Sequence, residues 1–154
     1  MDLVYRYEAD FTEVVPVGFV PEGIRLDVHS SGQVVEGSLS GATLRGIDYL
    51  LLRSDGVGVI DAHNVISTDS GQHVSDRAQG YIDTPPPELQ MPPPEAMLLP
   101  DTQWPDFPLP MHGFALYRTG AEELAWMNRT ALAFEGTVNV GTGKLIVEAR
   151  AQKS

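Results

Sequence analysis

The sequence predicts an all-β fold, a single antiparallel β-barrel with an internal cavity and one long Pro-rich loop. Three observations carry this prediction. Strand-like alternation dominates the chain, glycines interrupt it at short intervals, and polar residues lie on otherwise apolar strand faces. Short antiparallel strands in a chain of this length form a sandwich or a barrel, and inward polar residues favour a ligand-holding barrel of about eight strands.

The clearest early strand is centred on Ile24, Leu26 and Val28, which alternate with charged or polar neighbours. This period of two is typical of a strand with one buried face and one solvent-exposed face. It is followed by glycines at intervals that suit hairpins or bulges.

A hairpin is predicted from two strand-like runs, 47–53 and 57–66, joined by Ser54-Asp55-Gly56. Asp48 shares the face of Leu50 and Leu52 on the first run. On the second run, we assign the inner face to the following residues: Val57, Val59, Asp61, His63 and Val65.

Two further strands are expected near the C-terminus. Residues 126–135 alternate, and the predicted shared face holds Trp126, Asn128, Thr130, Leu132 and Phe134. The last strand is predicted over 144–151, with Leu145, Val147 and Ala149 inward. The stretch 121–126 is compatible with a helix but is too short to predict one.

Residues 84–110 hold ten of the twelve prolines and predict a long non-sheet insertion. One interpretation is a variable surface loop. The other is a lid over the barrel mouth, because Met91, Met97, Leu98, Leu99, Trp104 and Phe107 are too apolar for a free linker. A Pro-rich ligand segment is a third, less favoured reading.

Composition limits the partners. The 154 residues predict one domain over 1–154, and the net charge of −11 with ten Lys and Arg disfavours nucleic acid and anionic membranes. The chain has no cysteine and its first residues do not resemble a signal peptide, so we expect a cytoplasmic protein. The expected partners are a small apolar metabolite and further copies of this chain in a homodimer or higher homo-oligomer.

Asp61 and His63 are the first candidates for chemistry. They are two residues apart on a strand and therefore point the same way. An imidazole beside a carboxylate in an apolar pocket is suited to acid/base work. The alternative is a hydrogen-bonded pair that holds the barrel together.

Two more residues are assigned to the catalytic set. Asp48 either holds neighbouring strands together through hydrogen bonds or polarises the substrate. Asn128 either stabilises an oxyanion or forms hydrogen bonds with buried backbone groups. The predicted substrate-contacting residues are Tyr49, Arg53, Trp104, Tyr117 and Trp126. No phosphate-binding loop, dinucleotide fingerprint or nucleophile elbow is present, and we expect neither cofactor nor metal.

Several motifs in order resemble the domain of unknown function 3237 family. They are Pro21-Glu22-Gly23-Ile24-Arg25, Glu36-Gly37, Asp48-Tyr49-Leu50, Asp55-Gly56, Asp61-Ala62-His63, Asp69-Ser70-Gly71, Tyr117-Arg118-Thr119 and Trp126-Met127-Asn128-Arg129. The resemblance spans the chain except the Pro-rich segment and implies a small calycin or lipocalin-like barrel. Its departures are His63, where the family pattern has Arg, and Ser70, where an Asp-Gly turn is usual.

The predicted function is a cofactor-independent enzyme that carries out cyclisation, isomerisation, or addition or elimination of water on a small apolar metabolite. Natural-product biosynthesis is the expected setting, by analogy of fold alone. In this interpretation His63 is the acid/base and Asp61 orients it, while Asp48 or Asn128 polarises the substrate. The alternatives are a carrier or sensor that binds without turnover, and a packed structural barrel.

Overall fold

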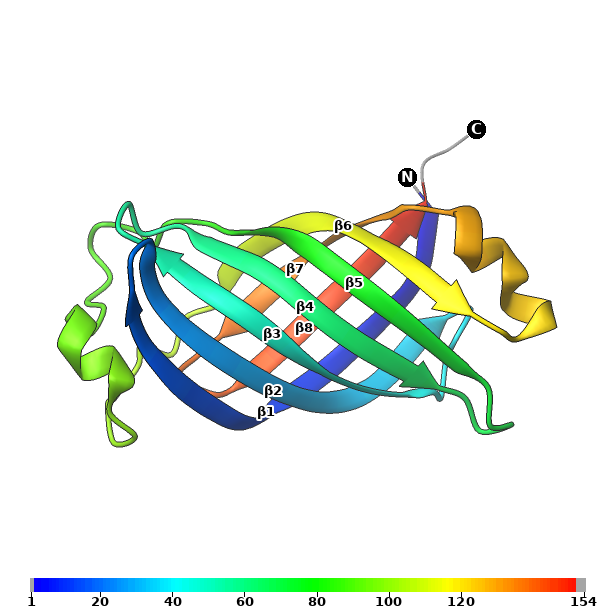
Figure 1. The fold of residues 1–154 in the computed structure, drawn as a ribbon, viewed down its shortest axis with the longest axis horizontal. Coiled ribbons are helices and arrows are strands. Elements are labelled where there is room, and N and C mark those ends of the chain that lie inside the picture. The colour runs from blue at the N-terminus through cyan, green and yellow to red at the C-terminus, as the bar shows by residue number, and fades with distance from the viewer. Residues whose placement is uncertain (1, 152–154) are drawn as a thin grey trace.

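Eight antiparallel strands close into a barrel in the computed structural model, which describes residues 2–151 (Figure 1). They are β1 (Asp2–Val20), β2 (Gly23–Gly37), β3 (Thr43–Arg53), β4 (Gly58–Ser67), β5 (His73–Ile82), β6 (Leu109–Thr119), β7 (Leu132–Asn139) and β8 (Lys144–Ala151). Each strand pairs with the next in sequence, and β1 pairs with β8 to close the ring. The all-β barrel prediction is confirmed.

The first two strands are the longest, and β1 is bent around the barrel by irregular pairing. Its register with β2 shifts between Arg6 and Tyr7, between Phe11 and Glu13, and between Pro16 and Gly18. Bulges of this kind increase local twist and curvature, and a proline in a strand is tolerated at such a place. The long strands therefore curve enough to close the barrel.

Four of the strands predicted from the sequence are present, namely β2, β3, β4 and β8. Ile24, Leu26 and Val28 are buried on β2. β3 and β4 form the predicted hairpin, and Gly56 in its turn has a φ of 88°, a conformation that strongly favours glycine. Residues 144–151 form β8, with Val147 and Ala149 buried as predicted.

The strand predicted from residue 126 is wrong. Residues Glu122–Arg129 form a 3₁₀ helix, η2, and the strand begins only at Leu132. The helix packs at one end of the barrel and buries Met127 completely. Burial of Met127 in the folded barrel therefore determines that this segment is helical, although its alternation of apolar and polar residues is also compatible with a strand.

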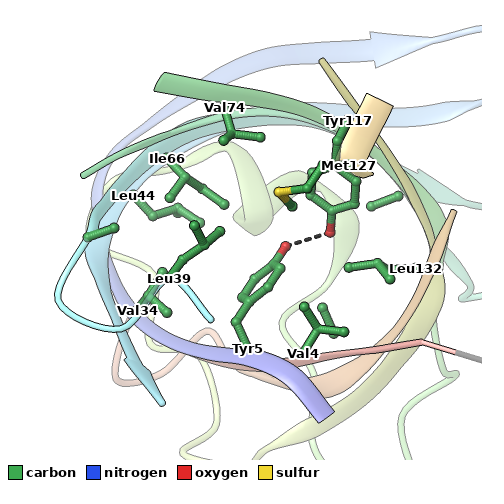
Figure 2. Packing of buried hydrophobic residues seen from close by; sticks show 13 residues of the cluster. Val4, Tyr5, Val34, Leu39, Leu44, Ile66, Val74, Tyr117, Met127 and Leu132 are labelled. Carbon is green, nitrogen blue, oxygen red and sulfur yellow. Dashed lines mark hydrogen bonds between the residues drawn. The ribbon is translucent and has the colours of Figure 1, made fainter. Parts of the chain in front are cut away.

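One end of the barrel is filled by side chains, and we call it the closed end. Figure 2 shows its core, in which Met127 of η2 reaches the interior beside Tyr117 and Leu132. The largest side chains there are almost completely buried: Val34, Leu44, Ile66, Val74, Tyr117, Met127 and Leu132. The interior at this end is therefore solid.

The opposite end, the open end, carries the connection between β5 and β6. This connection runs over residues 83–108 and holds the short 3₁₀ helix η1 (Pro94–Leu98) (Figure 1). As the prolines predict, it contributes no strand. Leu89, Met97, Leu98 and Phe107 pack against the buried residues of this end of the barrel.

Candidate functional site

A large cavity of about 1090 Å³ occupies the open end. Its walls are mainly apolar side chains of the barrel, such as Leu26 and Leu50. The Pro-rich connection adds Met97, Leu98 and Trp104 to the lining. We call this the upper cavity, and its size and lining are those of a site for a small organic molecule.

A smaller cavity of about 60 Å³ lies deeper in the barrel, toward the closed end. We call it the lower cavity. It shares Ser30, Asp48, Met111 and Leu145 with the upper cavity, so the two are neighbours. Its lining includes two carboxyls, one amide and three tyrosines.

Small residues on the adjacent strands β3, β4 and β5 leave space beside the carboxyls of Asp48 and Asp76. Asp48 lies in one row across the sheet with Ala62 and Ala78, and the next row is formed by Gly46, Asn64 and Asp76. A Cβ at Gly46 would overlap the Asn64 amide. Larger side chains in these rows would fill the lower cavity.

Asp48 stands at the junction of the two cavities. One of its carboxylate oxygens, Oδ1, accepts a hydrogen bond from the backbone N–H of Asp61 at 3.0 Å. Burial raises the pKa of Asp48 to about 7, because desolvation disfavours the charged form more than this hydrogen bond favours it. Near neutral pH, Asp48 is thus able both to take up and to release a proton.

Asp76 is the second interior carboxyl. Its Oδ1 accepts a hydrogen bond from the Asn64 amide at 2.9 Å, and both side chains are buried. Burial raises the pKa of Asp76 to about 6, and the hydrogen bond from Asn64 opposes this shift.

Three tyrosines complete the lower cavity. The hydroxyl oxygens of Tyr5 and Tyr117 are 2.6 Å apart and share a hydrogen bond (Figure 2). The ring of Tyr7 stacks on that of Tyr5 with centroids 6.5 Å apart. Burial, and the nearby carboxyl of Asp76, raise the pKa of all three hydroxyls, so they remain protonated donors.

The predicted inward orientation of Asp61 and His63 is wrong. Their side chains are 36% and 54% exposed, and the inner residues of β4 are Ile60, Ala62 and Asn64. On the outer surface, Asp61 Oδ1 lies 3.8 Å from His63 Nε2 and 3.3 Å from Arg77 Nε. Both faces of β4 are rich in apolar residues, so the alternation does not reveal which one turns inward.

Asp48 lies on the predicted face with Leu50 and Leu52, and all three line the upper cavity. Tyr49 is on the outer surface, where its ring lies 5.7 Å from the His63 ring and 5.2 Å from the Arg25 guanidinium carbon. The predicted contact of Tyr49 with an internal ligand is therefore not available.

Arg53 lines the upper cavity at the β3–β4 turn, and its Nε donates to Asp55 Oδ1 at 3.1 Å. Trp104 also lines this cavity, from the Pro-rich connection. Tyr117 lines the lower cavity and is almost fully buried. These three residues stay candidates for contact with a ligand.

Asn128 and Trp126 lie on η2, outside both cavities. The Asn128 side chain accepts from the Thr119 backbone N–H at 2.8 Å and donates to the Thr119 carbonyl at 2.9 Å. It therefore satisfies backbone at the end of β6, which is the alternative role considered for it. Trp126 packs against the closed-end core.

Sequence reasoning missed Asp76, Asn64 and Tyr7. A signal was present on β5, where Val74, Asp76 and Ala78 alternate with polar neighbours. The inward amide of Asn64 is found only when the other face of β4 is taken as the inner one.

Within residues 2–151, no group of three or more His, Cys, Asp and Glu side chains has an arrangement that would hold a metal ion. No helix in that range is long and apolar enough to span a bilayer.

Comparison with known proteins places the chain in a family. The model described as "Protein of unknown function (DUF3237)" matches residues 1–153, so the chain belongs to this family, as the sequence motifs indicated. No curated protein matches it.

Three solved structures share the fold at low identity. One is a protein of unknown function from Clostridium acetobutylicum, with a TM-score of 0.78 and 16% identity over 99% of this chain and 98% of that one. A beta-barrel like protein from Acinetobacter baumannii gives 0.68 and 19% over 99% and 94%. An enzyme from Penicillium herquei gives 0.57 and 17% over 96% and 92%. These similarities support the fold alone.

Proposed function

We propose that this member of the family is an acid/base enzyme that uses its own side chains to move a proton on a small, largely apolar molecule. The observation that carries the proposal is the position of Asp48. It is a half-buried carboxyl with a pKa of about 7 at the junction of the upper and lower cavities. A base whose pKa lies near the working pH is efficient in proton transfer.

The upper cavity supplies binding and excludes water. Its apolar walls would hold the body of the substrate next to Asp48. A carboxylate that has lost its hydration shell is a stronger base toward a bound C–H or O–H than one in water. Asp48 would take this proton and return it at another atom of the substrate, which gives isomerisation, cyclisation, or addition or elimination of water.

Tyr7 on the wall of the lower cavity would stabilise, through its hydroxyl, the charge that develops on the substrate when Asp48 removes the proton. Tyr7 is a neutral hydroxyl donor there, held apart from bulk water. Donors fixed before the reaction stabilise developing negative charge better than mobile water does.

We infer that the Pro-rich connection is the lid of this site. It brings Met97, Leu98 and Trp104 to the lining of the upper cavity, whereas the polar residues Glu88, Glu95 and Asp101 of the same connection are exposed. This division of side chains supports a role in covering a ligand.

Two other functions were considered from the sequence. A packed structural barrel requires a filled interior, and the open end is hollow. A carrier that binds without turnover requires only the apolar cavity, so the test below is designed to separate it from an enzyme.

The test uses 5-nitrobenzisoxazole, a neutral apolar probe that opens when a base removes its C–H proton. The electron pair of that bond forms the nitrile as the N–O bond breaks, which leaves a coloured phenolate. We expect acceleration over buffer of about 10²-fold or more, with a rate that rises through a pKa of about 7. Asp48→Asn should abolish the acceleration.

Asp69→Asn is the matched control, because it is the same change at an exposed turn residue that does not act on the pKa of Asp48. It should leave the rate unchanged. Binding of the probe without acceleration would favour the carrier, and an equal loss of rate in both variants would contradict a special role for Asp48.

A further inference from the structure

The interior of the barrel holds negative charge without a matching cation. Asp48 and Asp76 line the lower cavity, where no Lys, Arg or His lies among the described lining residues. Within residues 2–151, Arg53 is the one cationic side chain that lines the upper cavity, and at its rim it is paired with Asp55. A ligand that reaches the lower cavity therefore meets two carboxyls and no cationic side chain among the described residues.

Each interior carboxyl keeps one oxygen available to a ligand. Asp48 Oδ1 and Asp76 Oδ1 accept the hydrogen bonds from the Asp61 backbone and the Asn64 amide. Their Oδ2 atoms have no hydrogen-bond partner in residues 2–151, and neither is sealed away from the cavities. Two acceptor positions are thus open.

Tyr7 gives an independent sign of a missing polar ligand. Its side chain is half-buried and lines the lower cavity. Within the described chain its hydroxyl has no hydrogen-bond partner and is open to the cavity. Tyr5, Tyr117 and Phe134 add aromatic surface around the same space.

We propose that the lower cavity binds the ammonium group of a primary amine whose apolar body fills the upper cavity. This inference rests on the proposed function and specifies its substrate class. An ammonium has three N–H donors. Asp76 Oδ2 and the Tyr7 hydroxyl oxygen accept two of them, and the aromatic rings favour a nearby cation. Asp48 is left to reach the atoms next to the nitrogen.

Size and charge agree with this ligand class. A volume of about 60 Å³ holds a group not much larger than a water molecule, which suits a primary ammonium better than a quaternary one. The net charge of −11 attracts cations, and Glu22 and Asp83 line the upper cavity. Ligands with an anionic head group are therefore disfavoured in both the upper and the lower cavity.

The test compares decylamine, decanol and decanoate, which share one chain and differ in the charge of the head group. Each competes with a neutral fluorescent dye for the cavity at about pH 8, where both carboxyls are mainly ionised. We expect decylamine to bind about tenfold more tightly than decanol, and decanoate to bind about tenfold more weakly than decanol.

Asp76→Asn should remove most of the preference for decylamine and leave the affinity for decanol unchanged. The amide keeps an oxygen that accepts from Asn64 and lacks the charge. Tyr7→Phe should lower the same preference by about threefold. Asp61→Asn on the outer surface is the control and should change nothing.

Equal affinity of the wild type for decylamine and decanol, or an unchanged preference in Asp76→Asn, would overturn the amine proposal. If Asp48-dependent opening of 5-nitrobenzisoxazole persists in that case, the acid/base function stands and only the substrate class is wrong. If amines bind selectively without such turnover, the site binds amines and the enzymatic function fails.

Discussion

The two ends of the barrel are built from the same eight strands and have different interiors. At the closed end, η2 inserts Met127 among the large inward side chains of residues 2–151, of which only Tyr5 and Tyr117 border a cavity. At the open end, the barrel surrounds about 1090 Å³ of space, and the Pro-rich connection packs there. Between them lies the polar layer of Asp48, Asp76 and the tyrosines. We infer that the closed end supplies stability, which allows the open end to remain hollow.

The largest expected effect uses the same substitution at both ends. Met127→Ala should lower the free energy of unfolding by about 2–5 kcal/mol, because it opens a cavity in a filled core. Met111→Ala should cost about 1–2 kcal/mol, because Met111 already borders both cavities and loses fewer contacts. Urea denaturation measures both. Equal losses would contradict the contrast between the ends.

The polar layer should make stability depend on pH. The pKa of Asp48 is about 7 in the folded protein and near its ordinary value of about 3.9 when unfolded, so the folded state holds the proton more tightly. The stabilisation is complete below about pH 4 and is lost as pH rises through 7. The backbone N–H of Asp61 and the charge of Arg25 oppose this rise in pKa, whereas the carboxylates of Asp61 and Asp27 add to it.

Asp48→Asn cannot ionise and should reduce this loss, so it should be more stable than wild type at about pH 8 by roughly 1–3 kcal/mol. The measurement is denaturation at a series of pH values between about 4 and 8. Asp69→Asn, at an exposed turn, is the control and should follow the wild-type slope. An Asp48→Asn slope as steep as that of the wild type would mean that Asp48 is not desolvated.

The smallest effect on stability is expected in the Pro-rich connection. Replacing Met97, Leu98 and Trp104 with Ser should lower the unfolding free energy by about 1 kcal/mol or less, since none of them is fully buried. The affinity for a neutral apolar dye should fall by about tenfold. Replacing the exposed Glu88, Glu95 and Asp101 with Ser is the control. A large loss of stability with unchanged dye affinity would show a structural segment instead of a lid.

Alternation and turn residues were sufficient to predict β2, β3, β4 and β8, whereas β1, β5 and β6 were not predicted individually. The β3–β4 hairpin follows from Ser54-Asp55-Gly56 and the apolar runs beside it, because these signals act within a few residues. The 3₁₀ helix η2 was missed because its alternating pattern also fits a strand. Only burial of Met127 under the barrel end decides between the two.

The candidate site was predicted in part. Asp48 was placed on the face of Leu50 and Leu52, and this face does turn toward the cavity. Asp61 and His63 were assigned inward because Val59 and Val65 are as apolar as Ile60 and Ile66, and a shift of one residue exchanges the faces of a strand. Asn64 was missed for the same reason.

The sequence by itself determined the all-β class, the β3–β4 turn, the family and the proline-rich interruption, since all of these depend on local or consecutive signals. Only the tertiary structure decided which face of β4 lines the barrel interior and which carboxyls line the same cavity. Asp48 and Asp76 lie on strands separated by β4, and barrel closure turns both toward one lower cavity between small residues such as Ala62 and Ala78. Local patterns do not encode that meeting, because it depends on the register of three strands at once.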